Sequence, residues 1–187
     1  MRDTVGLLRR YFAPQPLEIV ETHSRCVADL ALEIANNLSL SAHERVFIEE
    51  AALLHDIGVS QVHAPGLGLM GTYPYIQHGV LGREILEREG LPDHGLVSER
   101  HTGVGLTRED IVRQNLPLPL RDMLPVSLPE QIICFADLFY SKKTGHLTER
   151  KSMALVRSKL IPFGEEKVEQ FDQWREQFRF GVGDGDV

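Results

Sequence analysis

The apolar residues of this chain recur every three or four positions, which is the spacing of one face of an α-helix. The segment 17–38 is the longest example, with Val20, Val27, Ala31 and Ile34 along one side. No run alternates apolar and polar residues over a length that predicts a useful strand. The predicted fold class is therefore all-α, a helical bundle. The expected helices cover 3–12, 17–38, 41–56, 77–88, 93–101, 107–115, 127–140, 150–160 and 164–178.

Local signals place several helix ends. Ser41 with Glu44, and Ser127 with Glu130, have the spacing of a capping box at a helix start. Thr107 precedes an acidic first turn, which is typical of an N-cap. Asp93 is expected to cap the helix that ends at His101, and two prolines, Pro14 and Pro16, are expected to break the first helix.

Composition bounds the protein class. The 187 residues are 42% hydrophobic and 25% charged, so we expect a single domain, 1–187, with a real core. No apolar run approaches the roughly 20 residues that cross a bilayer, and no signal peptide is evident, so a cytoplasmic location without membrane contact is expected. The net charge of −7 disfavours a nucleic-acid polymer but allows a small anionic substrate beside a metal ion. Cys26 and Cys134 are interpreted as buried small hydrophobes.

The stretch 51–58 contains a histidine and an aspartate that could bind a metal ion. Two leucines, an imidazole and a carboxylate follow one another, so His55 and Asp56 are expected at the end of a helix entering the interior, with Gly58 as its left-handed final residue. A buried carboxylate is costly unless it is paired, and a divalent cation is a suitable partner for both groups. A helix end with a hydrogen-bonded polar pair is the alternative for the dipeptide alone.

Other metal-ligand side chains fall on or at the ends of apolar helices. Each histidine alone could be a hydrogen-bonded core residue, whereas Asp137, expected in the middle of an apolar helix, needs a cation or a donor. Together they predict two divalent ions bridged by Asp56, because a carboxylate offers two oxygens. One ion would be held by His23, His55, Asp56 and Asp137, and the other by Asp56, His78 and His101.

The ordered set His23, His55-Asp56 and Asp137 resembles the HD superfamily of metal-dependent phosphohydrolases, and the string 55–58 resembles its HDIG subgroup. The resemblance covers 17–143, which would be the metal-binding core, with 1–16 and 144–187 as helical additions. His78 and His101 resemble the two-metal subset, such as the bacterial symmetrical diadenosine-tetraphosphate hydrolases. The resemblance thus implies two divalent ions, with iron, manganese, zinc, cobalt and nickel all open as their identity.

The resemblance also implies hydrolysis of a phosphate ester or anhydride in a small nucleotide-like substrate, with Asp56 or Asp137 handling the proton. Many relatives have a lysine where this chain has Val59, so phosphate contact is expected from another cation. The candidates are Arg25, Arg100, Lys142 and Lys143.

Several alternatives stay open at this point. A branch of the superfamily that includes the inositol oxygenases is similar in its ligand set and oxidises C–H bonds with two irons. A metal- or nucleotide-binding sensor is a third reading. The glycine- and proline-rich segment 60–77, which includes His63, is either a lid or an ordinary connection, and a homodimer is allowed.

Overall fold

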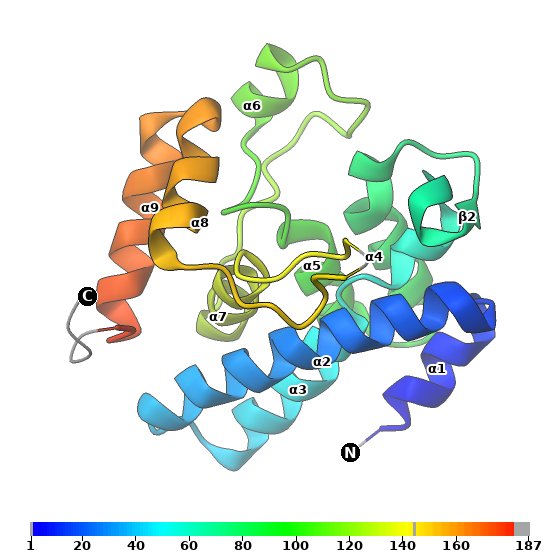
Figure 1. Cartoon of the computed structure of the whole chain (residues 1–187), viewed down its shortest axis with the longest axis horizontal. Helices are drawn as coiled ribbons and strands as arrows, with labels where there is room; N and C mark the ends of the chain where they lie inside the picture. The colour runs from blue at the N-terminus through cyan, green and yellow to red at the C-terminus, as the bar shows by residue number, and fades with distance from the viewer. Residues whose placement is uncertain (1, 144, 182–187) are drawn as a thin grey trace.

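The computed structural model describes residues 2–143 and 145–181, and it is helical, as the apolar spacing predicts. At its centre α2 (Pro14–Asn37) lies along α3 (Ala42–Leu54), and both pack against α7 (Leu128–Asp137) (Figure 1). A second pair, α4 (His78–Arg88) and α5 (Pro92–Arg100), packs closely together beside them. The remaining α-helices are α1 (Thr4–Tyr11), α6 (Arg108–Arg113), α8 (Met153–Leu160) and α9 (Glu165–Gln177).

Three of the four capping predictions are confirmed. Complete capping boxes start α3 at Ser41, α6 at Thr107 and α7 at Ser127, in each case with the acidic residue three positions later. These starts fix the phase of the helices that follow. They therefore also fix where the residues at the far ends of α3 and α7 lie.

Some predicted boundaries are wrong for identifiable reasons. Pro14 and Pro16 begin α2 instead of ending the preceding helix, since proline suits the first turn, where its missing N–H is not needed. For the same reason α5 begins at Pro92 and is not capped by Asp93. Helix α7 ends at Asp137 and does not continue to Tyr140, so this carboxylate terminates the helix.

Gly58 has a different role from the predicted left-handed helix end. The chain leaves α3 at Leu54 and enters a 3₁₀ turn, η1 (Ile57–Gln61), without a positive φ at Gly58. A Cβ at Gly58 would lie 2.0 Å from the His78 carbonyl oxygen and 2.3 Å from the Gly82 nitrogen. The glycine is required because α4 packs directly on this turn.

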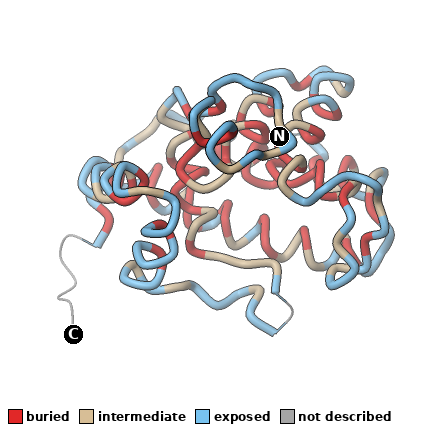
Figure 2. Tube along the Cα trace, turned by 90° about the horizontal axis from the view of Figure 1, so that it is seen from above, coloured by how far each residue is buried: buried red, intermediate tan, exposed pale blue. Residues whose placement is uncertain are grey.

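The core has two parts. The larger surrounds Phe135 of α7, whose ring contacts those of Phe139, Phe171, Phe178 and Phe180, and so joins α9 to the centre. The smaller lies between α1, η1 and α4. Figure 2 shows the buried stretches gathered through the middle of the molecule, with exposed turns around them.

The segment after η1 is a compact loop. A two-residue strand, β1 (His63–Ala64), pairs antiparallel with β2 (Leu69–Met70) around the 3₁₀ turn η2 (Pro65–Leu67). A further turn, η3 (Tyr75–Gln77), leads into α4. Among the residues described, no helix is both long and apolar enough to span a membrane.

Candidate metal centre

Six side chains from five parts of the chain meet in the interior. Each is delivered by a helix or by its end, because the central helices converge where α3, α5 and α7 finish. All of them except Asp137 are fully or almost fully buried. They are His23 within α2, His55 and Asp56 after α3, His78 at the start of α4, His101 at the end of α5 and Asp137 at the end of α7.

The first group of ligand atoms surrounds Asp137. His23 Nε2 lies 2.9 Å from Asp137 Oδ1, and His55 Nε2 lies 3.6 Å from the same oxygen. One ligand atom from each of these three residues falls within 4.8 Å of the others, which is close enough to hold a single ion. Asp56 Oδ2 is also near, 3.1 Å from His55 Nε2 and 3.3 Å from His23 Nε2.

The second group faces the other oxygen of Asp56. His78 Nε2 and His101 Nε2 each lie 3.7 Å from Asp56 Oδ1. The sequence-predicted ligands are therefore brought together as two sets, one at each oxygen of a single carboxylate.

Hydrogen bonds orient three of the imidazoles. The Nδ1 atom of each contacts the carbonyl oxygen three residues earlier, at 2.6 Å for His55, 2.7 Å for His78 and 2.7 Å for His101. A carbonyl can only accept, so each Nδ1 carries the proton and donates it. The neutral ring then presents the Nε2 lone pair to the cluster, which is the arrangement of a metal-ligating histidine.

Two of these lone pairs point at each other. His78 Nε2 and His101 Nε2 are 3.0 Å apart, although both rings have already placed their proton on Nδ1. Burial lowers the pKa of His101 to about 3, with further lowering from the charges of His55 and His78. Burial likewise lowers the pKa of His78. A cation between the two nitrogens would satisfy both.

The buried atoms of the first group also lack partners. His55 Nε2, both nitrogens of His23 and both carboxylate oxygens of Asp56 are buried without a hydrogen bond of acceptable geometry. Such groups cost free energy unless something compensates them. Nitrogen and carboxylate donors without partners fit a divalent metal ion, so these residues suit that group.

Charges inside the cluster favour the ionised carboxylates of Asp56 and Asp137, which are the forms that bind a metal ion. Burial would raise the pKa of Asp56 and Asp137, but the neighbouring histidines and Lys142 hold both well below the usual range. Burial lowers the pKa of His55, while the charges of Asp56 and Asp137 raise it to about 10 on balance. The ligating form of His55 is the neutral ring, so binding of a divalent ion would release any proton from its Nε2.

Among the four predicted phosphate contacts, the structure brings Lys142 to the cluster. Its Nζ lies 2.6 Å from Asp56 Oδ2, and its side chain is 13% exposed. Lys143 is exposed. The other two are paired elsewhere: Arg25 contacts Glu21 on the surface of α2 at 2.7 Å, and Arg100 contacts Glu130 at 2.8 Å, at the end of α7 far from Asp137.

Sequence reasoning missed two supporting residues. Ser98 donates its hydroxyl to the His55 carbonyl oxygen at 2.6 Å, and its own carbonyl holds His101. Tyr75 holds His78 through its carbonyl, and the two ring centroids are 4.9 Å apart. Their positions in the sequence could have indicated this role, because each residue whose carbonyl oxygen accepts the histidine hydrogen bond lies three positions before that histidine.

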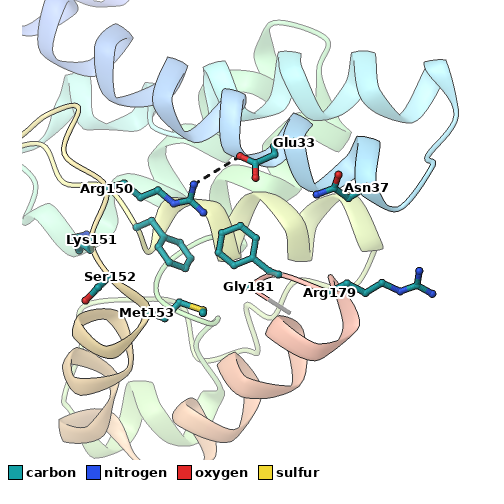
Figure 3. A pocket seen from close by; sticks show the side chains of 10 residues that line it. Glu33, Asn37, Arg150, Lys151, Ser152, Met153, Arg179 and Gly181 are labelled. Atoms are coloured by element: carbon teal, nitrogen blue, oxygen red, sulfur yellow. Dashed lines mark ion pairs between the residues drawn. The ribbon is translucent and has the colours of Figure 1, made fainter. Parts of the chain in front are cut away.

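Other histidines and cavities lie away from this cluster. His94 is buried, but it faces Glu50 at 3.4 Å, and His63 is exposed. A separate cavity has a volume of about 550 Å³, and none of the six candidate ligand residues lines it. Figure 3 shows its lining side chains, with Arg150 pointing toward Glu33. These two residues form an ion pair with an N–O distance of 3.8 Å.

The fold and the site together define a class of protein. It is a helical domain whose interior histidines and aspartates could bind a metal ion. Residues 20–141 match the HD domain family, well over half of the chain, and the chain belongs to this family. HD domains bind divalent metals and are generally metal-dependent hydrolases of the phosphohydrolase type.

Curated relatives cover much of the same region. An uncharacterized protein of Methanocaldococcus jannaschii is 36% identical over 64% of this chain and 65% of its own length. Two proteins named tRNA (cytidine(56)-2′-O)-methyltransferase also match. The one from Thermoplasma volcanium is 32% identical over 74% of this chain and 37% of its own length, and the one from Picrophilus torridus is 31% identical over 64% and 31%.

The chain therefore spans about a third of each of these methyltransferases and about two thirds of the uncharacterized relative. No solved structure matches the chain.

Proposed function

We propose that this chain is a two-metal phosphohydrolase that cleaves a phosphate ester or anhydride in a small nucleotide-like substrate. The observation that carries the proposal is the position of Asp56, with one oxygen toward His23 and His55 and the other toward His78 and His101. One carboxylate between two sets of imidazoles suits a bridged pair of ions.

The ligands divide naturally between two ions. His23, His55, Asp56 and Asp137 would hold one, and Asp56, His78 and His101 the other. Divalent ions in such a site activate water and neutralise phosphoryl oxygens. The carbonyls before His55, His78 and His101 keep the Nε2 atoms aimed inward, so the chain supplies a rigid cavity for the ions.

Asp137 and Lys142 are the groups that can meet substrate. The Asp137 side chain is 18% exposed whereas that of Asp56 is fully buried, so Asp137 is the carboxylate that accepts a proton from water or passes one to the product. The Lys142 ammonium lies beside the site and takes the phosphate contact for which relatives use the residue at position 59.

The test is hydrolysis by protein purified without chelator and loaded with manganese, cobalt, nickel, zinc or iron. The panel contains nucleotides, dinucleoside polyphosphates and simple phosphoesters, with Asp56→Ala as the control for a contaminating phosphatase. Hydrolysis of at least one substrate in the absence of oxygen, measured by chromatography of the products and lost in the control variant, is the expected result. Two irons per chain with oxygen consumption and no hydrolysis would instead indicate the oxygenase alternative.

The panel also contains tRNA, because two relatives are named for an activity on tRNA. The net charge of −7 favours the small substrates, since binding to a polymer of phosphates gains from a basic surface. Activity on tRNA alone would contradict the proposed substrate class.

A further inference from the structure

A small apolar cavity is lined in part by residues that neighbour two candidate metal ligands in the sequence. Its volume is about 220 Å³, below the roughly 300–1,000 Å³ of clefts that enclose a whole drug-sized ligand. Its walls include Ile76, Thr102, Leu116 and Phe163. Thr102 directly follows the candidate ligand His101, and Ile76 is the middle residue of the turn η3, whose C-cap is His78. A substrate phosphate at the metal centre would therefore leave its organic part close to this cavity.

One wall of the cavity is backbone. The segment 102–106 lines it, and Gly105 has φ 93°, where a Cβ would lie 2.8 Å from Pro125 Cδ. This segment is held in place by Lys167, which also lines the cavity and whose Nζ contacts the Gly105 carbonyl oxygen at 3.0 Å and Asp110 at 2.5 Å. A fixed stretch of peptide groups beside apolar side chains is a surface on which a flat ring system can lie.

Another part of the lining comes from outside the family match. Leu160 and Phe163 line the cavity from the end of α8 and from the turn η4 (Ile161–Phe163) that follows it, beyond residue 141. The Phe163 side chain is half exposed, at 50%, although its carbonyl oxygen is fixed by a 2.8 Å hydrogen bond from Arg113. A half-exposed aromatic ring on a fixed backbone at the wall of an apolar cavity is placed to stack on a ligand.

We infer that this cavity binds the nucleobase of the substrate, with Phe163 as its stacking partner. The inference rests on the proposed phosphohydrolase function for the phosphate, but the cavity and its ligand class are defined by their own residues. Among the lining residues, Gln114, Lys167 and the segment 102–106 carry polar groups that would provide hydrogen bonds to the edge of a base. The segment outside the family match thus supplies substrate specificity to the metal centre.

The first experiment needs no hydrolysis. The full chain is titrated with each of the four common ribonucleosides by calorimetry, for wild type, Phe163→Ala and Ile161→Ala. Ile161 is the matched control, since it lies in the same turn, is 60% exposed and does not line the cavity. We expect saturable binding of at least one nucleoside that is weakened roughly tenfold in Phe163→Ala and unchanged within twofold in Ile161→Ala.

The second experiment compares kcat/KM for nucleoside monophosphates with that for glycerol phosphate. We expect a preference for a nucleotide that Leu116→Trp, which fills the cavity, removes without changing the rate on glycerol phosphate. No binding of any nucleoside, or equal losses in the Phe163 and Ile161 variants, would overturn the inference. Nucleoside binding without hydrolysis of any phosphate would retain the cavity assignment and refute the proposed function. Hydrolysis with the same kcat/KM for nucleoside monophosphates and glycerol phosphate would support the proposed function and refute the cavity assignment.

Discussion

The two carboxylate oxygens of Asp56 face different histidines, so this residue is shared by both halves of the site. By contrast, His101 approaches only Oδ1. The two side chains therefore differ in how many ions depend on them.

Replacement of these two residues separates the two ions. We expect Asp56→Ala to lose both ions, because both depend on this shared carboxylate, while His101→Ala empties mainly one. Metal content per chain by mass spectrometry, after dialysis against buffered metal, measures both. Equal retention by the two variants would contradict the assignment of Asp56 as the bridge.

Lys142 is predicted to act on the phosphate and not on the ions. Lys142→Met should lower kcat/KM by roughly 10- to 100-fold, the range expected for a lost hydrogen bond to a charged group. Metal content should not fall, since removal of an ammonium 2.6 Å from Asp56 reduces repulsion toward a cation. The exposed neighbour provides the comparison, and a larger loss in Lys143→Met would refute the role given to Lys142.

At the scale of elements, close packing of η1 on α4 holds the two histidine pairs together. A Gly58→Ala substitution would push the turn away from the His78 carbonyl. We expect a lower melting temperature and weaker binding of one ion, because His78 moves with α4. Gly66→Ala is the matched control, as a Cβ there meets no atom within 4 Å. Similar behaviour of the two variants in thermal melts would argue against this packing role.

Helix positions and the candidate ligand residues could be predicted from the sequence because both follow from local patterns. Ser41, Thr107 and Ser127 cap helices as their spacing predicts, and the apolar face of α2 buries His23. The helix starts at Pro14 and Pro92 were missed for a local reason, the fit of proline to a first turn. The other failures depended on tertiary contacts. Nothing local distinguishes Lys142, which lies beside Asp56, from Arg100, which pairs with Glu130 on another helix. The role of Gly58 likewise required knowledge of what packs against it.

At the scale of the molecule, a buried ion pair ties the C-terminal helices to the family core. Lys167 of α9 contacts Asp110 of α6, and this pair also supports the wall of the apolar cavity. Burial would raise the pKa of Asp110, but hydrogen bonds from Lys167 and Thr107 lower it. The folded state therefore gains stability from Asp110 above the ordinary aspartate pKa of 3.8, and loses that gain as the pH falls below it.

Asp110→Asn tests this link by urea unfolding between pH 7 and pH 3. We expect a loss of about 3–5 kcal/mol at pH 7, because Lys167 stays buried without its charge partner. The variant should also lose less stability than wild type on acidification. Asp172→Asn, which breaks the exposed pair with Arg157, should cost less than about 1 kcal/mol. Equal costs for the two variants would show that burial does not strengthen the Asp110 contact.

The claim on which the account depends is that six converging side chains hold two divalent ions. Anomalous diffraction from crystals of metal-loaded protein locates those ions directly. We predict two peaks, one on each side of the Asp56 carboxylate, with His23, His55 and Asp137 at one and His78 and His101 at the other. A cluster without anomalous density, its histidines hydrogen-bonded only to protein and water, would contradict the account.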